Sequence, residues 1–426
     1  MSEISNVQIQ EVLEDLRESA KNVEFIQRKF LFEEQGCYVF LGVRRAGKSY
    51  LMYQRMHELV ATGISWDDII YVNFEDERLI GFDVSDFNKI LECHSSQNGS
   101  KPVLFLDEVQ NVPGWHKFAR RLADSKYVVY ITGSNANMLS SEISTTLGGR
   151  YFVREVFPYS FKEFLEANDF NLPRRLTTQA RGQVRSFFKD YFYNGGFPES
   201  LMYKDKRSYI SSVFQKIYLG DIVARNGISN VAQLRMLIKK LAESVKQPIS
   251  YNRISNVVAS SGLKIGVNTV ISLVDACCAS WLLMPLKNYV GKFGEKESKP
   301  KYYFIDNGLL NLLLVNPVTT LLENLVAVSL FRNFGHDRDN EKVFFYNAGV
   351  EVDFYVPDEE LAVQACYSVA KTDDTMEREI VGLSKLPKVL PCKRRVVVTY
   401  DEEGTRQDAY GQIEIVPCWK WLLNEV

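Results

Sequence analysis

The sequence lacks the features of a secreted or membrane protein. Its seven cysteines are scattered, odd in number and without a C-x-x-C pair, which excludes a disulfide framework and gives no zinc-ligand spacing. The N-terminal stretch MSEISNVQIQEVLEDL is polar and contains no apolar signal-peptide core. The most hydrophobic stretch, residues 270–286, carries Asp275 and is short for a membrane span. We therefore expect a cytoplasmic protein that makes no membrane contact of its own.

Neither sign of charge is in large excess, and no internal repeat or low-complexity tract occurs. The chain carries 51 Lys and Arg against 53 Asp and Glu, a formal net charge of −2. Between residues 162 and 253, however, bases outnumber acids roughly two to one. A solvated helical surface is the simpler explanation of this excess of bases, and a nucleic-acid-binding face is the more specific alternative.

The N-terminal part does contain a regular alternation of strand and helix patterns. Four short apolar runs are typical of buried parallel strands: residues 37–41, 69–73, 103–106 and 128–131. Amphipathic stretches separate the runs, and a helix that extends to about Phe30 precedes the first of them. This order predicts an α/β fold in which helices cover both faces of a parallel sheet.

The pattern changes after about Pro158. Helix formers and bases dominate to about residue 245, and residues 252–283 predict a helix–turn–helix before a strand at 302–305, the order of a winged helix. A helix at 321–334 and four further strands predict a second, smaller α/β unit. At about 150 residues per domain the chain corresponds to roughly three domains. We place these domains at residues 1–160, 161–315 and 316–426.

A phosphate-binding motif follows the first apolar run. Residues 42–49, GVRRAGKS, fit the pattern G-x-x-x-x-G-K-[ST]. Its glycines let backbone N–H groups approach phosphate oxygens, and the helix that follows directs the positive end of its dipole at them. We expect Lys48 to reach the β- and γ-phosphates and the Ser49 hydroxyl to bind Mg²⁺. The predicted nucleotide-binding residues are Gly42, Arg44, Arg45, Ala46, Gly47, Lys48, Ser49 and Tyr50.

Two adjacent acids follow the third apolar run. Asp107 is expected to hold Mg²⁺ at the C-terminal edge of the sheet, where such sheets carry their ligands. Glu108 is expected to polarise the attacking water, so it decides hydrolysis rather than binding. Acids at a strand end are common surface caps, but together with the phosphate loop they predict a nucleoside triphosphatase.

Other residues are candidates to stabilise charge during phosphoryl transfer. Ser134 or Asn135 could contact the γ-phosphate or orient the water, although a simple polar turn explains them equally well. Arg150 is a candidate arginine finger that acts within the chain or on a neighbouring subunit of a homo-oligomer. Arg44 and Arg45 are alternatives, and a plain surface role stays open for each arginine.

Several motifs occur in order along nearly the whole chain. They are GVRRAGKS, YVNFEDERL, FLDEVQNVPGWHKFARRL, YITGSNANMLSSEISTTLGGRY, FPYSFKEFL, YNGGFPES, YYFIDNGLLNLL, LLENLVAVSL and GVEVDFYV. Together they resemble a prokaryotic family of AAA+-like P-loop ATPases. The resemblance implies ATP as the nucleotide, a P-loop NTPase sheet, a helical and winged-helix middle, and a small C-terminal α/β domain similar to PD-(D/E)xK nucleases.

The C-terminal region departs from the nuclease pattern. That pattern needs a helix Glu, a strand Asp, and an acid followed at two residues by Lys, which together hold magnesium and activate water. Glu323 and Asp353 match the first two, but the third element runs from Gln364 to Cys366. Gln364 can ligate a metal only weakly, and Cys366 cannot supply the cation of the lysine. We therefore expect a degenerate, nuclease-shaped scaffold without nuclease activity.

Three functions remain in competition. The first is an ATPase that works as a switch or motor on DNA, on another nucleic acid or on a protein partner. The second is a nucleotide-regulated scaffold that hydrolyses ATP negligibly without a partner. It is favoured by residues 267–276, the second helix of the helix–turn–helix, which carry no positive charge for a DNA groove. The third and weakest is an ATP-gated, metal-dependent nuclease.

Overall fold

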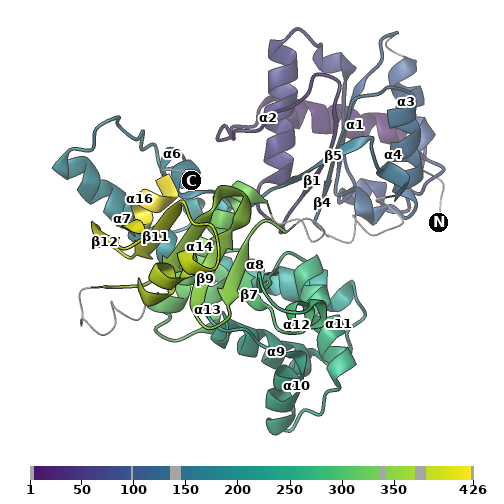
Figure 1. Cartoon of the computed structure of the whole chain (residues 1–426). Helices are drawn as coiled ribbons and strands as arrows, with labels where there is room; N and C mark the ends of the chain where they lie inside the picture. The colour runs from purple at the N-terminus through teal and green to yellow at the C-terminus, as the bar shows by residue number, and fades with distance from the viewer. Residues whose placement is uncertain (1–3, 97–98, 135–144, 336–340, 370–379, 424–426) are drawn as a thin grey trace. The chain divides into compact units, whose positions relative to one another are not determined.

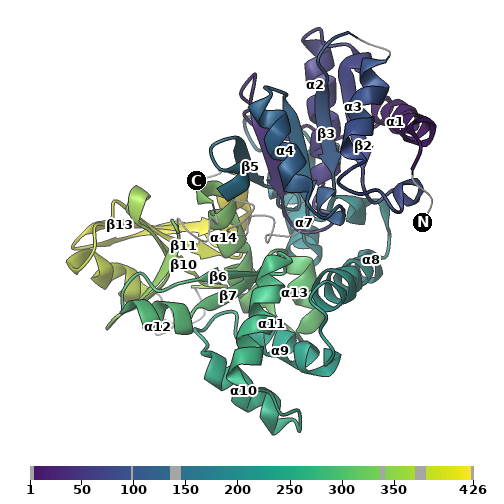
Figure 2. The same cartoon turned by 90° about the vertical axis from the view of Figure 1, so that its right-hand side faces the viewer.

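The computed structural model describes residues 4–96, 99–134, 145–335, 341–369 and 380–423. The chain divides into a first unit, Met1–Val156, and a second unit, Phe157–Val426 (Figures 1 and 2). Within the described residues, no helix combines the length and the apolar character that crossing a bilayer requires.

A five-stranded parallel sheet forms the centre of the first unit, in the order β2-β3-β4-β1-β5. Its strands are β1 (Cys37–Leu41), β2 (Ile69–Asn73), β3 (Val103–Asp107), β4 (Val129–Gly133) and β5 (Tyr151–Glu155). Its helices are α1 (Asn6–Lys21), α2 (Lys48–Ala61), α3 (Phe87–Ser95) and α4 (Trp115–Asp124). Helix α2 lies on one face of the sheet and α3 and α4 on the other (Figure 1), which explains why β1 to β4 are apolar on both sides.

Two features of this unit differ from the expectation from sequence. Strand β5 is not predicted, because it is an edge strand with partly exposed side chains and no continuous apolar run. Helix α1 ends at Lys21 rather than near Phe30. The segment after it is not helical, and it packs Phe30 and Phe32 against Phe40 of β1. Tertiary contacts therefore override a helical pattern there.

Helices make up the first part of the second unit. They are α6 (Phe161–Glu166), α7 (Thr178–Asn194), α8 (Lys206–Gln215), α9 (Val231–Glu243), α10 (Tyr251–Ser260) and α11 (Val267–Ala279), with a π-helical segment (Lys216–Ala224) after α8. Helices α10 and α11 form a helix–turn–helix, followed by an antiparallel hairpin of β6 (Leu283–Leu286) and β7 (Lys301–Phe304), with α12 (Phe293–Ser298) between these strands. Helix α11 ends earlier than predicted because Trp281 has a left-handed backbone, with φ of 59°, and the chain then enters β6.

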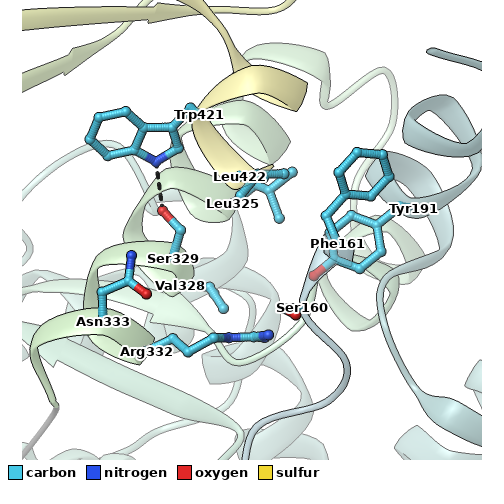
Figure 3. A pocket seen from close by; sticks show the side chains of 10 residues that line it. All are labelled: Ser160, Phe161, Tyr191, Leu325, Val328, Ser329, Arg332, Asn333, Trp421 and Leu422. Carbon is cyan, nitrogen blue, oxygen red and sulfur yellow. Dashed lines mark hydrogen bonds between the residues drawn. The ribbon is translucent and has the colours of Figure 1, made fainter. Parts of the chain in front are cut away.

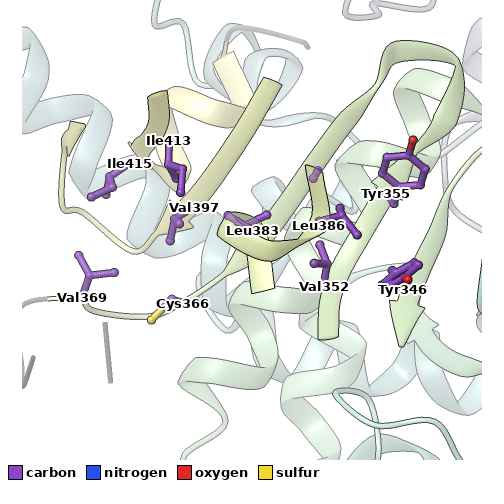
Figure 4. Packing of buried hydrophobic residues seen from close by; sticks show 11 residues of the cluster. Tyr346, Val352, Tyr355, Cys366, Val369, Leu383, Leu386, Val397, Ile413 and Ile415 are labelled. Atoms are coloured by element: carbon purple, nitrogen blue, oxygen red, sulfur yellow. The ribbon is translucent and has the colours of Figure 1, made fainter. Parts of the chain in front are cut away.

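A mixed six-stranded sheet completes the second unit, in the order β12-β13-β11-β10-β9-β8. Its strands are β8 (Phe344–Asn347), β9 (Glu351–Val356), β10 (Leu361–Ala365), β11 (Arg394–Thr399), β12 (Gly404–Asp408) and β13 (Gly411–Pro417); the helices are α13 (Asn307–Leu313), α14 (Val318–Phe334) and α16 (Cys418–Leu423). Figure 4 shows part of the core, where Leu383 and Leu386 cover Val352, Val397 and Ile413 of three strands. The predicted fold class, a parallel α/β sheet followed by helices and a separate α/β unit, is confirmed.

Arg332 of α14 fixes the first residues of the second unit. Its Nη2 donates to the carbonyl oxygen of Pro158 at 3.0 Å, and its guanidinium lies 5.5 Å from the ring centroid of Phe157. A cavity of about 20 Å³, room for one water molecule, lies beside this arginine (Figure 3). Trp421 of α16 borders the cavity and donates from its indole nitrogen to Ser329 Oγ at 2.8 Å.

We predict that Gly195→Ala destabilises the second unit. Gly195 has φ of +74°, and a Cβ there would lie 1.8 Å from Oδ1 of Asp306. That carboxylate accepts hydrogen bonds from the backbone N–H groups of Gly196 at 2.7 Å and Gly308 at 2.8 Å. We expect a loss of about 2 kcal/mol or more in the free energy of unfolding, measured in urea.

The matched control for this prediction is Gly182→Ala, within α7. Gly182 is exposed, and a Cβ there meets nothing within 4 Å. Because alanine is the better helix former, the control should gain about 0.5–1 kcal/mol. Equal stability of the Gly195→Ala variant and the unchanged protein would contradict the role given to Asp306.

Candidate functional site

The phosphate loop, residues 42–49, connects β1 to α2. Strand β1 ends at Leu41, and α2 begins at Lys48, directly after Gly47 with its left-handed φ of 93°. The loop also passes close to the end of the first unit, because a Cβ at Gly42 would lie 2.1 Å from the carbonyl oxygen of Val156. Both glycines are therefore required by the path of the backbone.

Lys48 is buried within this loop, with 4% of its surface exposed. Its Nζ donates to two carbonyl oxygens of the loop, both at 3.1 Å, and lies 3.8 Å from Glu108 Oε1. The buried Arg28 also supports the loop, since its Nη1 donates to the carbonyl oxygen of Ala46 at 3.2 Å. The ammonium is thus held beside the helix N-terminus, where phosphate oxygens bind in such loops.

Asp107 ends β3 and is 1% exposed. Tyr71 Oη donates to its Oδ2 at 2.9 Å, and Thr132 Oγ1 donates to its Oδ1. Burial and the charge of Glu108 raise the pKa of Asp107, while hydrogen bonds from Thr132, Ser49 and Tyr71 oppose the shift. Ser49 and Asp107 therefore meet, and they offer the oxygen ligands that Mg²⁺ prefers.

Glu108 follows in a left-handed conformation, with φ of 50°. Its backbone N–H donates to Thr132 Oγ1 at 2.9 Å, and its Oε2 accepts a hydrogen bond from Gln110 Nε2. Burial pushes the pKa of Glu108 up, but the charge of Lys48 and the hydrogen bond from Gln110 outweigh burial and bring the pKa below its ordinary value. The carboxylate is therefore ionised at neutral pH and can accept a proton.

The other predicted loop residues lie around this centre. Arg44 Nη1 forms an ion pair with Glu75 Oε1 at 2.7 Å, just beyond the C-terminal end of β2. Arg45 has a left-handed backbone, with φ of 65°. Tyr50 lies on α2 with 40% of its surface exposed, and its ring centroid is 5.7 Å from that of Tyr53.

Arg150 lies at the N-terminal ends of the strands, opposite the end of the sheet that carries the phosphate loop. It precedes Tyr151, which pairs with Cys37 at the start of β1, and its Nε is 2.6 Å from Asp124 Oδ1. The five residues of β1 span about 16 Å at 3.3 Å per residue. The structure therefore does not bring Arg150 to Lys48 within one chain, and a role on a neighbouring subunit stays a prediction.

Thr132, Tyr71 and Gln110 are site residues that the sequence patterns miss. Thr132 lies beside Asp107 because β3 and β4 are parallel neighbours, and the strand register is the signal that would have found it. Ser134 is buried, and its Oγ accepts from Gln110 Nε2 at 3.4 Å. Asn135, the other candidate, lies outside the described residues.

The predicted nuclease-like residues also come together. Glu323 lies on α14, Asp353 on β9 and Gln364 on β10, and Gln364 Oε1 accepts from the backbone N–H of Asp353 at 3.2 Å. A residue that sequence reasoning missed, Lys301 of β7, places its Nζ 3.2 Å from Asp353 Oδ1 and 3.5 Å from Glu323 Oε1. Across the described parts of the chain, no three His, Cys, Asp or Glu side chains form a group that could hold a metal ion.

The electrostatics of this second centre are those of a buried ion pair. Burial lowers the pKa of Lys301, but the charges of Glu323 and Asp353 outweigh burial and raise it above its ordinary value. Burial, followed by the charge of Asp353, raises the pKa of Glu323 to about 7. Lys301 is therefore charged at neutral pH and is surrounded by acids.

Comparison with known families and proteins identifies relatives. Residues 34–165 match an AAA domain, and residues 185–320 match a domain of unknown function (DUF8612). An uncharacterized protein of Methanocaldococcus jannaschii is 34% identical, over 97% of this chain and 95% of its own. An uncharacterized protein of Haemophilus influenzae is 33% identical, over 91% of this chain and 94% of its own.

Among solved structures, the Walker-type ATPase of Pyrococcus abyssi is similar over 73% of this chain and 94% of its own, with 13% identity and a TM-score of 0.41. A likeness at this level carries no argument about function. The functional argument therefore rests on the AAA domain match and on the geometry of the residues.

We predict that Thr132→Val destabilises the first unit. Valine keeps the shape of threonine but removes the hydroxyl that donates to Asp107 and accepts from the backbone of Glu108. Two buried polar groups lose a partner, so we expect a loss of about 1–3 kcal/mol in the free energy of unfolding, measured in urea without nucleotide. Thr132→Ser keeps the hydroxyl and should lose markedly less. Similar losses for both variants would contradict this account.

Proposed function

We infer the function of this chain from its family and its geometry: the chain belongs to the same family as the uncharacterized protein of Methanocaldococcus jannaschii, and its residues 34–165 match an AAA domain. We propose that it binds ATP with Mg²⁺ and hydrolyses ATP, and that this reaction drives a switch or motor. The observation that supports the proposal is the approach of Lys48 to Glu108 and of Ser49 to Asp107 at the C-terminal edge of one parallel sheet.

In this proposal the phosphate loop binds the triphosphate. Its backbone N–H groups and the N-terminus of α2 face the phosphate oxygens, and Lys48 exchanges its bonds to loop carbonyls for bonds to the β- and γ-phosphates. Ser49 and Asp107 would hold Mg²⁺, which when bound neutralises charge on the phosphates. Arg44, which pairs with Glu75, is a further cation close to the loop.

Glu108 is proposed to act on the attacking water. The water oxygen forms a bond to the γ-phosphorus, the bond to the β–γ bridging oxygen breaks, and Glu108 accepts the proton that the water loses. Thr132 fixes both acids, because its hydroxyl bonds to the side chain of Asp107 and to the backbone of Glu108. Gln110 holds the second carboxylate oxygen of Glu108 and limits how that oxygen can turn.

The chain offers a covalent route for a switch. Val156 ends the first unit, its backbone N–H donates to Leu41 at 2.7 Å, and its carbonyl oxygen lies where a side chain at Gly42 would be. A movement of the phosphate loop on nucleotide binding would therefore act on the residue that leads into Phe157 and the second unit.

The partner that the switch acts on is proposed from the surface of the second unit. The exposed positions of α11 include Asn268, Thr269, Ser272 and Asp275, none of which carries a positive charge. This favours a protein partner, or a scaffold role, over a helix that reads a DNA groove. Exposed bases such as Arg253 could still bind DNA phosphates without reading sequence. A homo-oligomer would give Arg150 a site on a neighbouring subunit.

We predict that Glu108→Gln binds ATP but does not turn it over. The amide cannot accept the proton, so steady-state phosphate release should fall about 10²–10⁴-fold, while ATP affinity by calorimetry changes little. Lys48→Ala should lose ATP binding as well. Glu92→Gln, an exposed acid on α3, is the matched control and should keep the full rate. Full turnover of Glu108→Gln would remove Glu108 from the proposed mechanism.

The same assay separates the candidate partners. We expect phosphate release to be indifferent to added duplex or single-stranded DNA if a protein partner controls the switch. Stimulation by DNA that weakens in Arg253→Glu and falls steeply with salt would instead identify a phosphate-backbone contact. ATP binding without turnover under every condition would favour the nucleotide-regulated scaffold.

A further inference from the structure

The side chain of Lys301 has an environment that the proposed ATPase function does not explain. Lys301 is the first residue of β7, in the hairpin that follows the helix–turn–helix, and it is 0% exposed. A lysine is almost never fully buried unless an acid accompanies it, because removing an ammonium from water costs several kcal/mol. The structure therefore has to supply compensating partners.

Those partners are the two acids of the nuclease-like set. Lys301 Nζ lies 3.2 Å from Asp353 Oδ1 and 3.5 Å from Glu323 Oε1, and both carboxylates are buried, with 6% and 1% of their surfaces exposed. A third acid, the half-exposed Glu351, lies 3.8 Å from the same nitrogen. A +1 charge therefore stands between carboxylates that, in a metal-dependent nuclease, would face a divalent ion.

Further protein donors bond to these two acids, at Asp353 Oδ2 and at the same Glu323 oxygen that Lys301 approaches. Asp353 Oδ2 accepts from the backbone N–H of Ala365 at 3.1 Å. Tyr303, two residues after Lys301 on β7, donates from its hydroxyl to Glu323 Oε1 at 2.9 Å. Metal ions such as Mg²⁺ and Ca²⁺ need several oxygens within about 2.0–2.6 Å, directed at one point. Here protein donors already occupy that position.

A second set of hydrogen bonds joins β7 to α14. Asn324, next to Glu323 on α14, accepts from the backbone N–H of Phe304 at 2.7 Å and donates to the carbonyl oxygen of Phe304 at 3.0 Å. Both ends of β7 are thus fixed to α14, the first by charge and the last by an amide. The match to the domain of unknown function ends at residue 320, so these bonds cross its boundary.

We propose that the Lys301 ammonium is the resident cation of this centre, that it takes the place of a divalent metal ion, and that the centre is a clasp that joins the β6–β7 hairpin to α14 and β9. The clasp makes the helix–turn–helix and the C-terminal sheet respond as one body to any movement that the first unit imposes. This inference does not depend on ATP hydrolysis, so it can fail or hold independently of the proposed function.

The first test is Mn²⁺ binding by the full-length chain without nucleotide. We use a Ser49→Ala background to remove the predicted metal ligand of the phosphate loop, and measure binding by calorimetry and by the electron paramagnetic resonance of Mn²⁺. The parent should bind no Mn²⁺ at this centre. One bound Mn²⁺ that Asp353→Asn abolishes would overturn the proposal. This test leaves Lys301 unchanged, so its result is valid even if the Lys301 variants fail to fold.

The second test removes the ammonium. Lys301→Met keeps a side chain of similar length but removes the ammonium between the two buried carboxylates, so the melting temperature should fall by several degrees and Mn²⁺ should raise it again. Lys299→Met, an exposed lysine two residues away, is the matched control and should melt like the parent. A folded Lys301→Met variant that gains no Mn²⁺ affinity, or that melts like the control, would overturn the proposal.

A double variant separates charge from packing. Adding Asp353→Asn to Lys301→Met removes one of the two carboxylates that have lost their ammonium partner. The double variant should therefore recover part of the melting temperature that Lys301→Met loses. Additive losses would show that Lys301 contributes only packing, and would contradict the clasp.

Discussion

A charge that leaves water must be met by opposite charge or by hydrogen bonds, and both centres of this protein are built on that constraint. In the first unit the buried ionisable groups are Lys48, Asp107 and Glu108, which lie at the end of one sheet. Thr132 bonds to the side chain of Asp107 and to the backbone of Glu108, Gln110 bonds to Glu108, and Lys48 bonds to carbonyl oxygens of the phosphate loop. In the second unit they are Lys301, Glu323 and Asp353. An unmet charge at any of these places would cost a sizeable share of the 5–15 kcal/mol that typically separates folded from unfolded domains.

The two centres meet the constraint in different ways, and the difference predicts what each can do. Lys48 bonds to neutral carbonyl oxygens of a loop and stands 3.8 Å from Glu108, so it can exchange these partners for the oxygens of a phosphate. Lys301 is enclosed by acids that cannot be exchanged, because they belong to α14 and β9. The arrangement around Lys48 suits reversible binding of a ligand, and the arrangement around Lys301 suits a permanent link between secondary-structure elements.

This contrast gives a consistent account of a chain with an AAA domain and a long second unit. If ATP is hydrolysed at the phosphate loop, Val156 offers a covalent route for the change out of the first unit, because its carbonyl oxygen lies where a side chain at Gly42 would be. At its own end, the second unit holds the incoming segment through Arg332 of α14. Because α14 also carries Glu323, the entry point and the clasp lie on one helix. The division of the second unit into domains at 161–315 and 316–426 stays a prediction, and the Lys301–Glu323 pair crosses it.

Features that depend on neighbours along the chain can be predicted from the residues alone. The loop at 42–49, the strands β1 to β4, the acids at 107–108 and the helix–turn–helix all follow from local pattern, because buried parallel strands are apolar throughout and phosphate loops need fixed glycine positions. Contacts between residues that are distant in sequence depend on the fold. Thr132 reaches Asp107 through the order of the strands, and the parallel direction of β1 and β5 puts Arg150 at the end of the sheet opposite the phosphate loop. Lys301 reaches Asp353 across 52 residues of sequence. Contacts of this kind are set by topology and by the burial of charge, which no local pattern records.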